Sequence, residues 1–236
     1  MTLYLFPNTL GSRRVSDLPS SMGEAVKKIN GLIAESDKGG RSFLRLWGIP
    51  EIHKVPLAIL PKKPSSKKDY DFYLQPIIEN NENWGIVSDA GLPCIADPGA
   101  LLVARARECG IAVQGFSGPC SITLSLMLSG LPGQTFSFLG YLPKSPKDRE
   151  KIFASATRTK GETKIFIEAP YRNVHTFRTA IAFLPTQSLL CVASDLSTEN
   201  EFVCTRSVGQ WRSYKDLDNV CERISKTPTI FLFHIF

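Results

Sequence analysis

The stretch GIVSDAGLPCIADPG, at residues 85–99, decides the fold class of this chain. It begins as a short apolar run that is typical of a buried strand, and it continues into two consecutive turns rich in glycine and proline. In open α/β sheets, ligands bind outside the carboxyl ends of the strands, where turning backbone leaves N–H and C=O groups free. Gly91 lets the backbone approach a ligand closely, and Pro93 stiffens the turn. The stretch therefore predicts a strand followed by a binding loop at 88–93.

The end of the same stretch has the pattern of a helix start. Asp97 followed by Pro98 matches an N-cap with proline at the first helical position. The helix that follows would carry Leu101, Val103 and Ala104. For Asp97 we therefore expect a capping role rather than a role in binding.

Short β-branched and aromatic runs alternate with longer helix-period segments around this stretch, which predicts βα units and a largely parallel sheet. Strands are expected at 3–6, 32–35, 55–60, 84–89 and 111–116. Helices are expected at 22–29, 42–46, 70–80 and 101–109. These elements together predict one open sheet for the first half of the chain.

A turn, SGPCS at 117–121, separates these elements from a second series. An apolar helix is expected at 121–128 and further strands at 135–142, 164–168, 189–193, 201–205 and 229–233. The strands around Leu190 and Phe202 are separated only by a polar turn, which implies an antiparallel pair. We therefore expect an α/β protein with two domains, 1–117 and 118–236, whose first sheet is mostly parallel and whose second is mixed.

Phosphate-binding loops are missing from the sequence, since neither G-x-G-x-x-G nor G-x-x-x-x-G-K-[ST] occurs. H-E-x-x-H and G-x-S-x-G are also missing, so zinc peptidases and α/β-hydrolases lose their usual support. We expect a ligand that is not held by phosphates. Free N–H groups at the helix start near Gly118–Ser121 suit its polar end, although a simple domain linker explains this turn equally well.

The composition is that of a folded protein, because 43% of the 236 residues are hydrophobic and 21% are charged. The apolar segment at 229–236 is only as long as a strand, so no membrane span is expected. In the N-terminal MTLYLFPNTLGSRR the basic pair follows the apolar stretch, which is the wrong order for a secretory signal. We therefore expect a cytoplasmic protein.

Neither the cysteines nor the histidines form a metal-binding pattern. No C-x-x-C pair occurs among the six cysteines, and the three histidines lie far apart. The cysteines are expected to be reduced core residues, and no metal is expected.

The net charge of +6 comes with clustered basic residues, which fits a polyanionic partner. For any single cluster, a solvated loop is the simpler explanation. A loop rich in proline, serine and lysine, expected to be mobile, lies at 60–68. The clusters are Arg13 and Arg14; Lys62, Lys63, Lys67 and Lys68; and Lys144, Lys147, Arg149 and Lys151.

The opening stretch is one of an ordered series of motifs: LYLFPNTLG (3–11), VSDAGLPCIADPG (87–99), SGPCS (117–121), SGLP (129–132), FLGYLP (138–143), IFIEAPYRN (165–173) and KTPTIFLF (226–233). This series resembles the tetrapyrrole methylase superfamily of S-adenosylmethionine-dependent methyltransferases over nearly the whole chain. Within it, the chain is most similar to the bacterial branch of small-subunit ribosomal RNA ribose methyltransferases.

The resemblance implies a homodimer that binds S-adenosylmethionine in the cleft between its two α/β domains. It also implies which residues contact the cofactor, largely through their backbone. Those of the first domain are Pro7, Leu10, Gly11, Ser88, Asp89, Ala90, Gly91, Leu92 and Pro93. Those of the second domain are Gly118, Pro119, Cys120, Ser121, Glu168, Ala169 and Pro228.

The sequence departs from the ribosomal RNA branch at three places. The branch has E-D-T-R where this chain has Glu35, Ser36, Asp37 and Lys38, so the second acid is missing. Ser117 stands where a proline is usual, and Tyr171 replaces the histidine of E-S-x-H-R. We expect the cofactor-binding fold to be kept despite these departures. The identity of the methyl acceptor is what they leave open.

Methyl transfer from a sulfonium depends mainly on alignment in a partly dry cleft. If the acceptor is a hydroxyl, a general base helps to remove its proton, and the candidate catalytic residues are Glu35, Asp89 and Glu168. Lys38 and Arg172 are candidates for orienting a phosphate of the substrate. For each acid, a capping or salt-bridge role explains the residue at least as well.

Three functions stay open at this point. We rank methylation of a ribose 2′-hydroxyl in ribosomal RNA first, because of the resemblance and the basic clusters. Methylation of a tetrapyrrole-like small molecule is second, since a flat carboxylated substrate also suits arginines. A non-catalytic module that binds S-adenosylmethionine is third.

Overall fold

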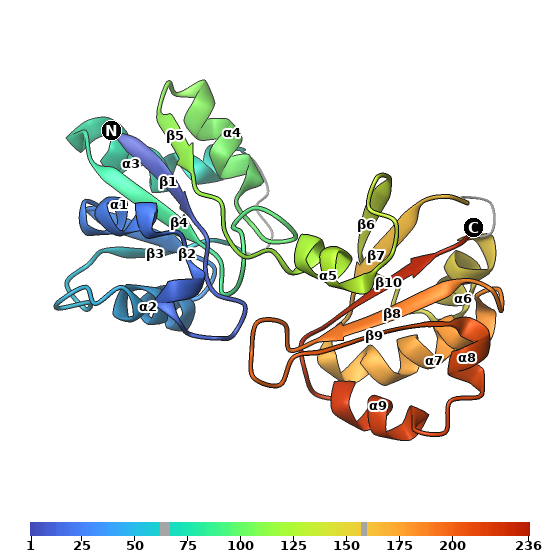
Figure 1. Ribbon diagram of the computed structural model, residues 1–236. Coiled ribbons are helices and arrows are strands. Elements are labelled where there is room, and N and C mark those ends of the chain that lie inside the picture. The colour runs from blue at the N-terminus through green and yellow to red at the C-terminus, as the bar shows by residue number, and fades with distance from the viewer. Residues whose placement is uncertain (62–66, 157–159) are drawn as a thin grey trace. The chain divides into compact units, whose positions relative to one another are not determined.

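Five parallel strands form the sheet of the first half of the protein in the computed structural model (Figure 1). Their order across the sheet is β3-β2-β4-β1-β5, so that β1 lies between β4 and β5. Because all five strands run in the same direction, the loops that follow them gather at one edge. The strands are β1 (Thr2–Phe6), β2 (Gly31–Ala34), β3 (Leu57–Ile59), β4 (Asn83–Val87) and β5 (Ala112–Gly115).

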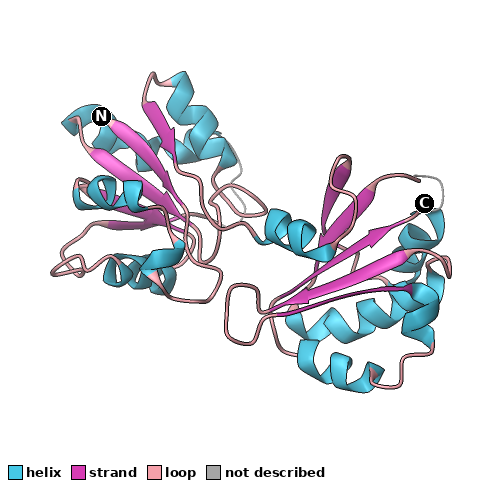
Figure 2. Ribbon diagram, in the orientation of Figure 1, coloured by secondary structure: helices cyan, strands magenta, loops and turns pink. Residues whose placement is uncertain are grey.

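Helices cover both faces of this sheet (Figure 2). Phe6 packs with helices α1 and α2 on one face, whereas Leu3 packs with α3 and α4 on the other. This division follows from the alternation of side chains along a strand. The helices are α1 (Gly23–Lys27), α2 (Asp37–Leu46), α3 (Asp71–Asn80) and α4 (Ala100–Glu108).

The second half contains a mixed five-stranded sheet in the order β6-β7-β10-β8-β9. β6 and β7 are parallel, and the other neighbours are antiparallel. The predicted antiparallel pair around Leu190 and Phe202 is confirmed as β8 and β9. The strands are β6 (Phe136–Tyr141), β7 (Thr163–Ile167), β8 (Leu189–Ser194), β9 (Phe202–Ser207) and β10 (Thr229–His234).

One large core joins this sheet to four helices. Phe177, Trp211 and Phe231 are fully buried in it, and all four helices α6–α9 contribute side chains. Helix α5 does not share this core, although the Thr205 hydroxyl donates a hydrogen bond to the Ser129 carbonyl at its end. The helices are α5 (Ser121–Ser129), α6 (Pro146–Ser155), α7 (Asn173–Phe183), α8 (Val208–Arg212) and α9 (Leu217–Ile224).

The structure describes residues 1–61, 67–156 and 160–236, and the contacts between Cα atoms divide it into two units, Met1–Cys120 and Ser121–Phe236. Lys62, Lys63 and most of the predicted mobile loop lie outside the described residues. None of the helices within the described ranges has both the length and the apolar character needed to cross a membrane. Two α/β domains, one with a parallel and one with a mixed sheet, agree with the predicted fold class.

Three predictions about helices are wrong. Asp97 does not cap α4, because Gly99 occupies the N-cap position with a left-handed φ of 130° and the helix starts at Ala100. Helix α2 starts at Asp37, because the Ser36 hydroxyl accepts a hydrogen bond from the Gly39 N–H and caps it. Helices α6, α7, α8 and α9 were not predicted from the sequence.

Candidate functional site

A buried asparagine ties together two loops at the carboxyl edge of the first sheet. The Asn8 side-chain amide donates hydrogen bonds to the carbonyls of Ser88 (3.0 Å) and Asp89 (3.2 Å). Its backbone N–H donates to the Gly91 carbonyl at 2.8 Å. The loop after β1 and the loop after β4 are therefore held as one body. Asn8 lies within the motif LYLFPNTLG, but nothing in the sequence indicated that its side chain would bridge the two loops.

Two glycines allow a third loop, the one after β5, to join the first two. A Cβ added at Gly118 would lie 2.2 Å from the Pro7 Cβ, closer than any side chain tolerates. At Gly91, where φ is +71°, a Cβ would lie 3.3 Å from Leu10 Cδ2 and 3.5 Å from the Pro119 carbonyl oxygen. The structure thus brings together five predicted cofactor residues of the first unit: Pro7, Leu10, Gly91, Gly118 and Pro119.

The rest of the loop after β4 has an unusual backbone. Cys94 and Ala96 have left-handed φ angles of 69° and 63°, a region that residues with a Cβ occupy at a cost. Gly99 follows with φ 130°. Such backbone persists only where the surrounding structure holds it, and it is often found at ligand sites.

Three acidic side chains converge beside these loops. A Glu35 carboxylate oxygen accepts a hydrogen bond from the Asp89 N–H at 3.1 Å, and the Ser36 hydroxyl donates to Asp89 Oδ1 at 2.7 Å. Two of the three candidate catalytic acids, Glu35 and Asp89, therefore lie together. Lys38 is exposed in the first turn of α2.

Asp97 is the third acid of this group. Burial raises its pKa to about 6, and the charges of Glu35 and Asp89 add to the increase, whereas a hydrogen bond from the Ser88 side chain opposes it. The residue that sequence analysis assigned to a helix cap is instead a half-buried acid next to the predicted binding loop.

In the second unit, Glu168 lies at the centre of a buried polar cluster directly after β7. Its carboxylate forms an ion pair with Arg172 and accepts hydrogen bonds from the Thr176 hydroxyl (3.0 Å) and the Ala169 N–H (3.3 Å). The side chain of Glu168 is 0% exposed and that of Arg172 is 15% exposed. Nε and Nη1 of Arg172 have no partner among the described residues.

Pro228 lies next to this cluster. In the antiparallel pairing of β7 and β10, Ile167 faces Ile230, so the residues just after β7 and just before β10 meet at one edge. The fully buried Asn173 donates hydrogen bonds to the carbonyls of Ile224 and Thr227, both at 2.9 Å, and so fixes the turn before Pro228. Glu168, Ala169, Arg172 and Pro228 are therefore neighbours within the second unit, whereas Ser121 begins helix α5.

One member of the basic clusters is not available to a partner. Arg149 is 2% exposed, and its guanidinium donates hydrogen bonds to the carbonyls of Pro143 and Lys144, both at 2.9 Å. Lys144 and Lys147 are exposed. In the described part of the chain, no three His, Cys, Asp or Glu side chains form a group suited to a metal ion, and the six cysteines are free thiols.

Comparison with known proteins places the chain among methyltransferases. No family model matches it. It is 36% identical to ribosomal RNA small subunit methyltransferase I of Halalkalibacterium halodurans, over 86% of this chain and 67% of that protein. It is 31% identical to the protein of the same name from Xylella fastidiosa, over 83% of this chain and 68% of that protein. The crystal structure of the methyltransferase CobJ has a TM-score of 0.65 at 13% identity, covering 99% of this chain and 93% of that one, which shows a shared fold. The chain is a methyltransferase, and it belongs to the ribosomal RNA small subunit methyltransferase I family, within the tetrapyrrole methylases.

Proposed function

We propose that this enzyme transfers a methyl group from S-adenosylmethionine to a ribose 2′-hydroxyl of small-subunit ribosomal RNA. The observation that carries the proposal is the match of more than four fifths of the chain to relatives named for methylating this RNA. An enzyme with this substrate would act in the cytoplasm.

The loops tied by Asn8 suit S-adenosylmethionine as the methyl donor. They offer backbone groups and close-approaching glycines at Gly91 and Gly118, and no phosphate-binding motif, which fits a cofactor without phosphates. When bound, this cofactor supplies an electrophilic methyl group on a sulfonium. Glu168, Ala169 and Pro228 form the corresponding contact region of the second unit in our proposal.

The residues of the chain contribute orientation and proton transfer. Glu35 and Asp89 are the better candidates for a general base, because they lie at the edge where the binding loops meet. Both carboxylate oxygens of Glu168 are already engaged within the second unit, so we assign it a positioning role. Lys38 is exposed and can meet a phosphate of the substrate, whereas Nε and Nη1 of Arg172 are buried, so we assign Arg172 to holding Glu168.

We also propose that the enzyme is a homodimer. Strand β6 lies at an edge of the second sheet and exposes Phe136, Leu139 and Tyr141. An open edge strand can pair with another chain, and exposed apolar residues on it mark an interaction site. Sedimentation velocity should give about twice the monomer mass, and Tyr141→Lys should shift the mass toward that of a monomer.

Binding of the cofactor tests the first part of the proposal. Calorimetry should detect binding of S-adenosylmethionine or of its demethylated product. Binding to the folded state alone should raise the free energy of unfolding by about 2.7 kcal/mol at a hundredfold excess over Kd. Neither heat nor a thermal shift at millimolar ligand would exclude S-adenosylmethionine as the donor.

The RNA substrate is tested in cells and in vitro. Mass-resolved analysis of ribosomal RNA from a deletion strain should reveal one missing ribose methyl group. RNA binding that neutralises six to ten phosphates should weaken by about a thousandfold or more between 50 and 200 mM salt. Replacing Lys62, Lys63, Lys67 and Lys68 by alanine should flatten this dependence and leave cofactor affinity nearly unchanged. Complete methylation in the deletion strain would contradict the proposal.

A further inference from the structure

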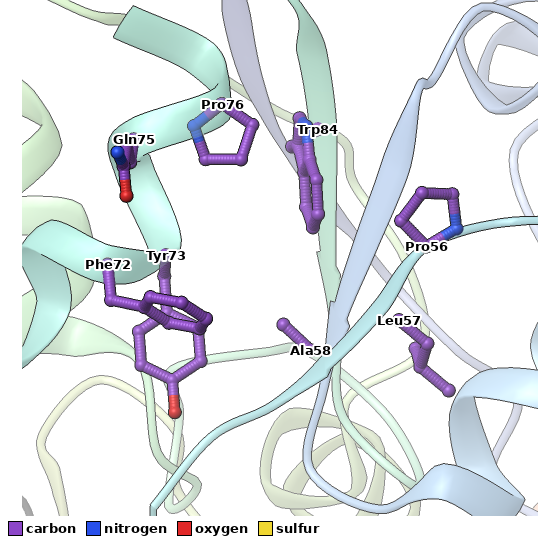
Figure 3. A pocket seen from close by; sticks show the side chains of 8 residues that line it. All are labelled: Pro56, Leu57, Ala58, Phe72, Tyr73, Gln75, Pro76 and Trp84. Atoms are coloured by element: carbon purple, nitrogen blue, oxygen red, sulfur yellow. The ribbon is translucent and has the colours of Figure 1, made fainter. Parts of the chain in front are cut away.

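An apolar pocket lies in the first unit, away from the carboxyl edge of its sheet. It has a volume of about 260 Å³ and lies between helix α3, the edge strand β3 and the start of β4 (Figure 3). Trp84 and Ser88 are four residues apart along β4 and the loop after it, so the pocket is about 13 Å from the binding loops. It is therefore distinct from the candidate methyl-transfer site. Its main lining residues are Pro56, Phe72, Tyr73, Gln75, Pro76 and Trp84.

Two of its aromatic rings are fixed in place. The Tyr73 hydroxyl donates a hydrogen bond to the Ile59 carbonyl at 2.7 Å, and the Trp84 indole N–H donates to Glu82 at 2.8 Å. The Trp84 ring also lies against Gly31, where a Cβ would come within 2.5 Å of it. Rigid aromatic rings provide a binding surface at a low cost in conformational entropy.

The third ring, that of Phe72, has no cover. The residue is 72% exposed, and its ring is nearly perpendicular to that of Tyr73, with the centroids 5.6 Å apart and the planes at 82°. A ring with this exposure is accessible for stacking. An exposed ring beside a pocket with rigid aromatic walls indicates a flat, apolar ligand.

The side-chain amide of Gln75, which lines the pocket, has a defined orientation. The Gln75 amide nitrogen lies 3.0 Å from both carboxylate oxygens of Glu79. Because a carboxylate only accepts hydrogen bonds, Gln75 must present its NH₂ group to Glu79, and its Oε1 is left as an acceptor. An exocyclic amino group, such as that of adenine or cytosine, would be a suitable donor.

We propose that this pocket binds one unstacked nucleobase of the RNA substrate, with the base stacked on Phe72 and its amino group facing Gln75. The inference rests on the RNA substrate proposed above. Pockets for larger ligands measure about 300–1,000 Å³, so this volume suits a single ring system. Recognition of single-stranded RNA commonly uses splayed bases on aromatic side chains. Lys68, exposed in the turn before α3, lies on the chain close to Phe72, where it can meet a neighbouring phosphate.

Fluorescence anisotropy with a labelled oligoadenylate of about eight nucleotides tests the pocket directly. Phe72→Ala and Phe72→Leu should each weaken binding about tenfold, because base stacking on an aromatic ring contributes about 1–3 kcal/mol. Phe72→Tyr should bind as the wild type does, because it keeps the ring. Phe183→Ala is the matched control, since Phe183 is also an exposed phenylalanine on a helix, at 43% exposure. Circular dichroism should show an unchanged fold for all four variants.

Two results would overturn the inference. If Phe72→Ala bound the oligonucleotide as tightly as the wild type, no base would bind in the pocket. If Phe72→Leu bound normally, the pocket would instead be a docking site for apolar protein side chains.

A second experiment separates this inference from the proposed function. It measures methylation of small ribosomal subunits from cells that lack the enzyme. Phe72→Ala should raise KM about tenfold and leave kcat unchanged. If the wild type methylates and this KM does not change, only the pocket inference fails. If the wild type does not methylate but Phe72 still governs RNA binding, only the proposed function fails.

Discussion

The loops at the sheet edge of the first unit and the Glu168 cluster of the second unit are stabilised by different kinds of interaction. In the first unit, Asn8 hydrogen-bonds to backbone carbonyls, and Gly91 and Gly118 let three loops approach closely. In the second unit, the buried ion pair of Glu168 and Arg172 holds the turn after β7. We therefore expect substitutions in the second region to reduce stability first, and those in the first region to reduce binding first.

Removing the buried charge should have the largest effect. Glu168→Ala leaves the largely buried Arg172 without its counter-charge, which should lower the free energy of unfolding by about 3–5 kcal/mol. Denaturant titration would measure this change. The control is Asp218→Ala, which removes an exposed ion pair. The side chain of Asp218 is 91% exposed and that of its partner Arg178 is 52% exposed, so the pair should contribute about 1 kcal/mol or less to the free energy of unfolding. Equal effects of the two substitutions would show that the second region does not depend on its buried pair.

Gly91→Val should separate binding from stability in the first region. A β-branched residue at φ +71° should cost about 1–3 kcal/mol of stability, and its side chain would meet Leu10 and Pro119. We expect the fold to persist and binding of S-adenosylmethionine to be lost, as measured by calorimetry. Gly110→Val is a matched control, because φ is +72° there and no atom lies within 4 Å of the added Cβ. Cofactor binding by both variants would mean that the turn at Gly91 has only a structural role.

The smallest expected change in the free energy of unfolding comes from removing the charge of Asp97 in the first region. The pKa of Asp97 is about 6 in the folded protein and about 3.9 in an unfolded chain. The folded state therefore holds this proton more tightly, and the free energy of unfolding decreases as pH rises from about 4 to 6. Asp97→Asn mimics the protonated form and should be more stable than the wild type by roughly 1–2 kcal/mol at pH 7, allowing for solvent screening. The two proteins should be equally stable at pH 4. A constant difference from pH 4 to pH 7 would rule out this titration.

The sequence predicted the strands better than the helices, for a physical reason. Strands are short apolar runs between turns, and the ten strands of the described residues were all predicted, with ends that differ by a few residues from the structure. Helix α9 was missed although Leu217, Val220, Cys221 and Ile224 recur at i, i+3, i+4 and i+7, the spacing of an amphipathic helix, so this pattern was present in the sequence and was overlooked.

The candidate site was predictable where it depends on local backbone and not where it depends on distant partners. Gly91 and Pro93 marked a loop that approaches neighbouring segments closely. The interactions of Asn8 join residues about eighty positions apart, so no local pattern could show them. Asp97 was misassigned because Asp-Pro also fits a helix cap, whereas the left-handed backbone at Ala96 and Gly99 moves the cap to Gly99.

The position of β1 in its sheet also affects how the protein folds during synthesis. Thr2 is paired with Asn83 of β4 on one side and with Ala112 of β5 on the other. Translation proceeds at about 5–20 residues per second, so β1 leaves the ribosome roughly 4–16 s before β4 exists. During that time Phe6 can already pack against helices α1 and α2, but both hydrogen-bonding edges of β1 have no native partner. The strand that supplies the Asn8 loop therefore waits longer for its pairing partners than any other strand of the first unit.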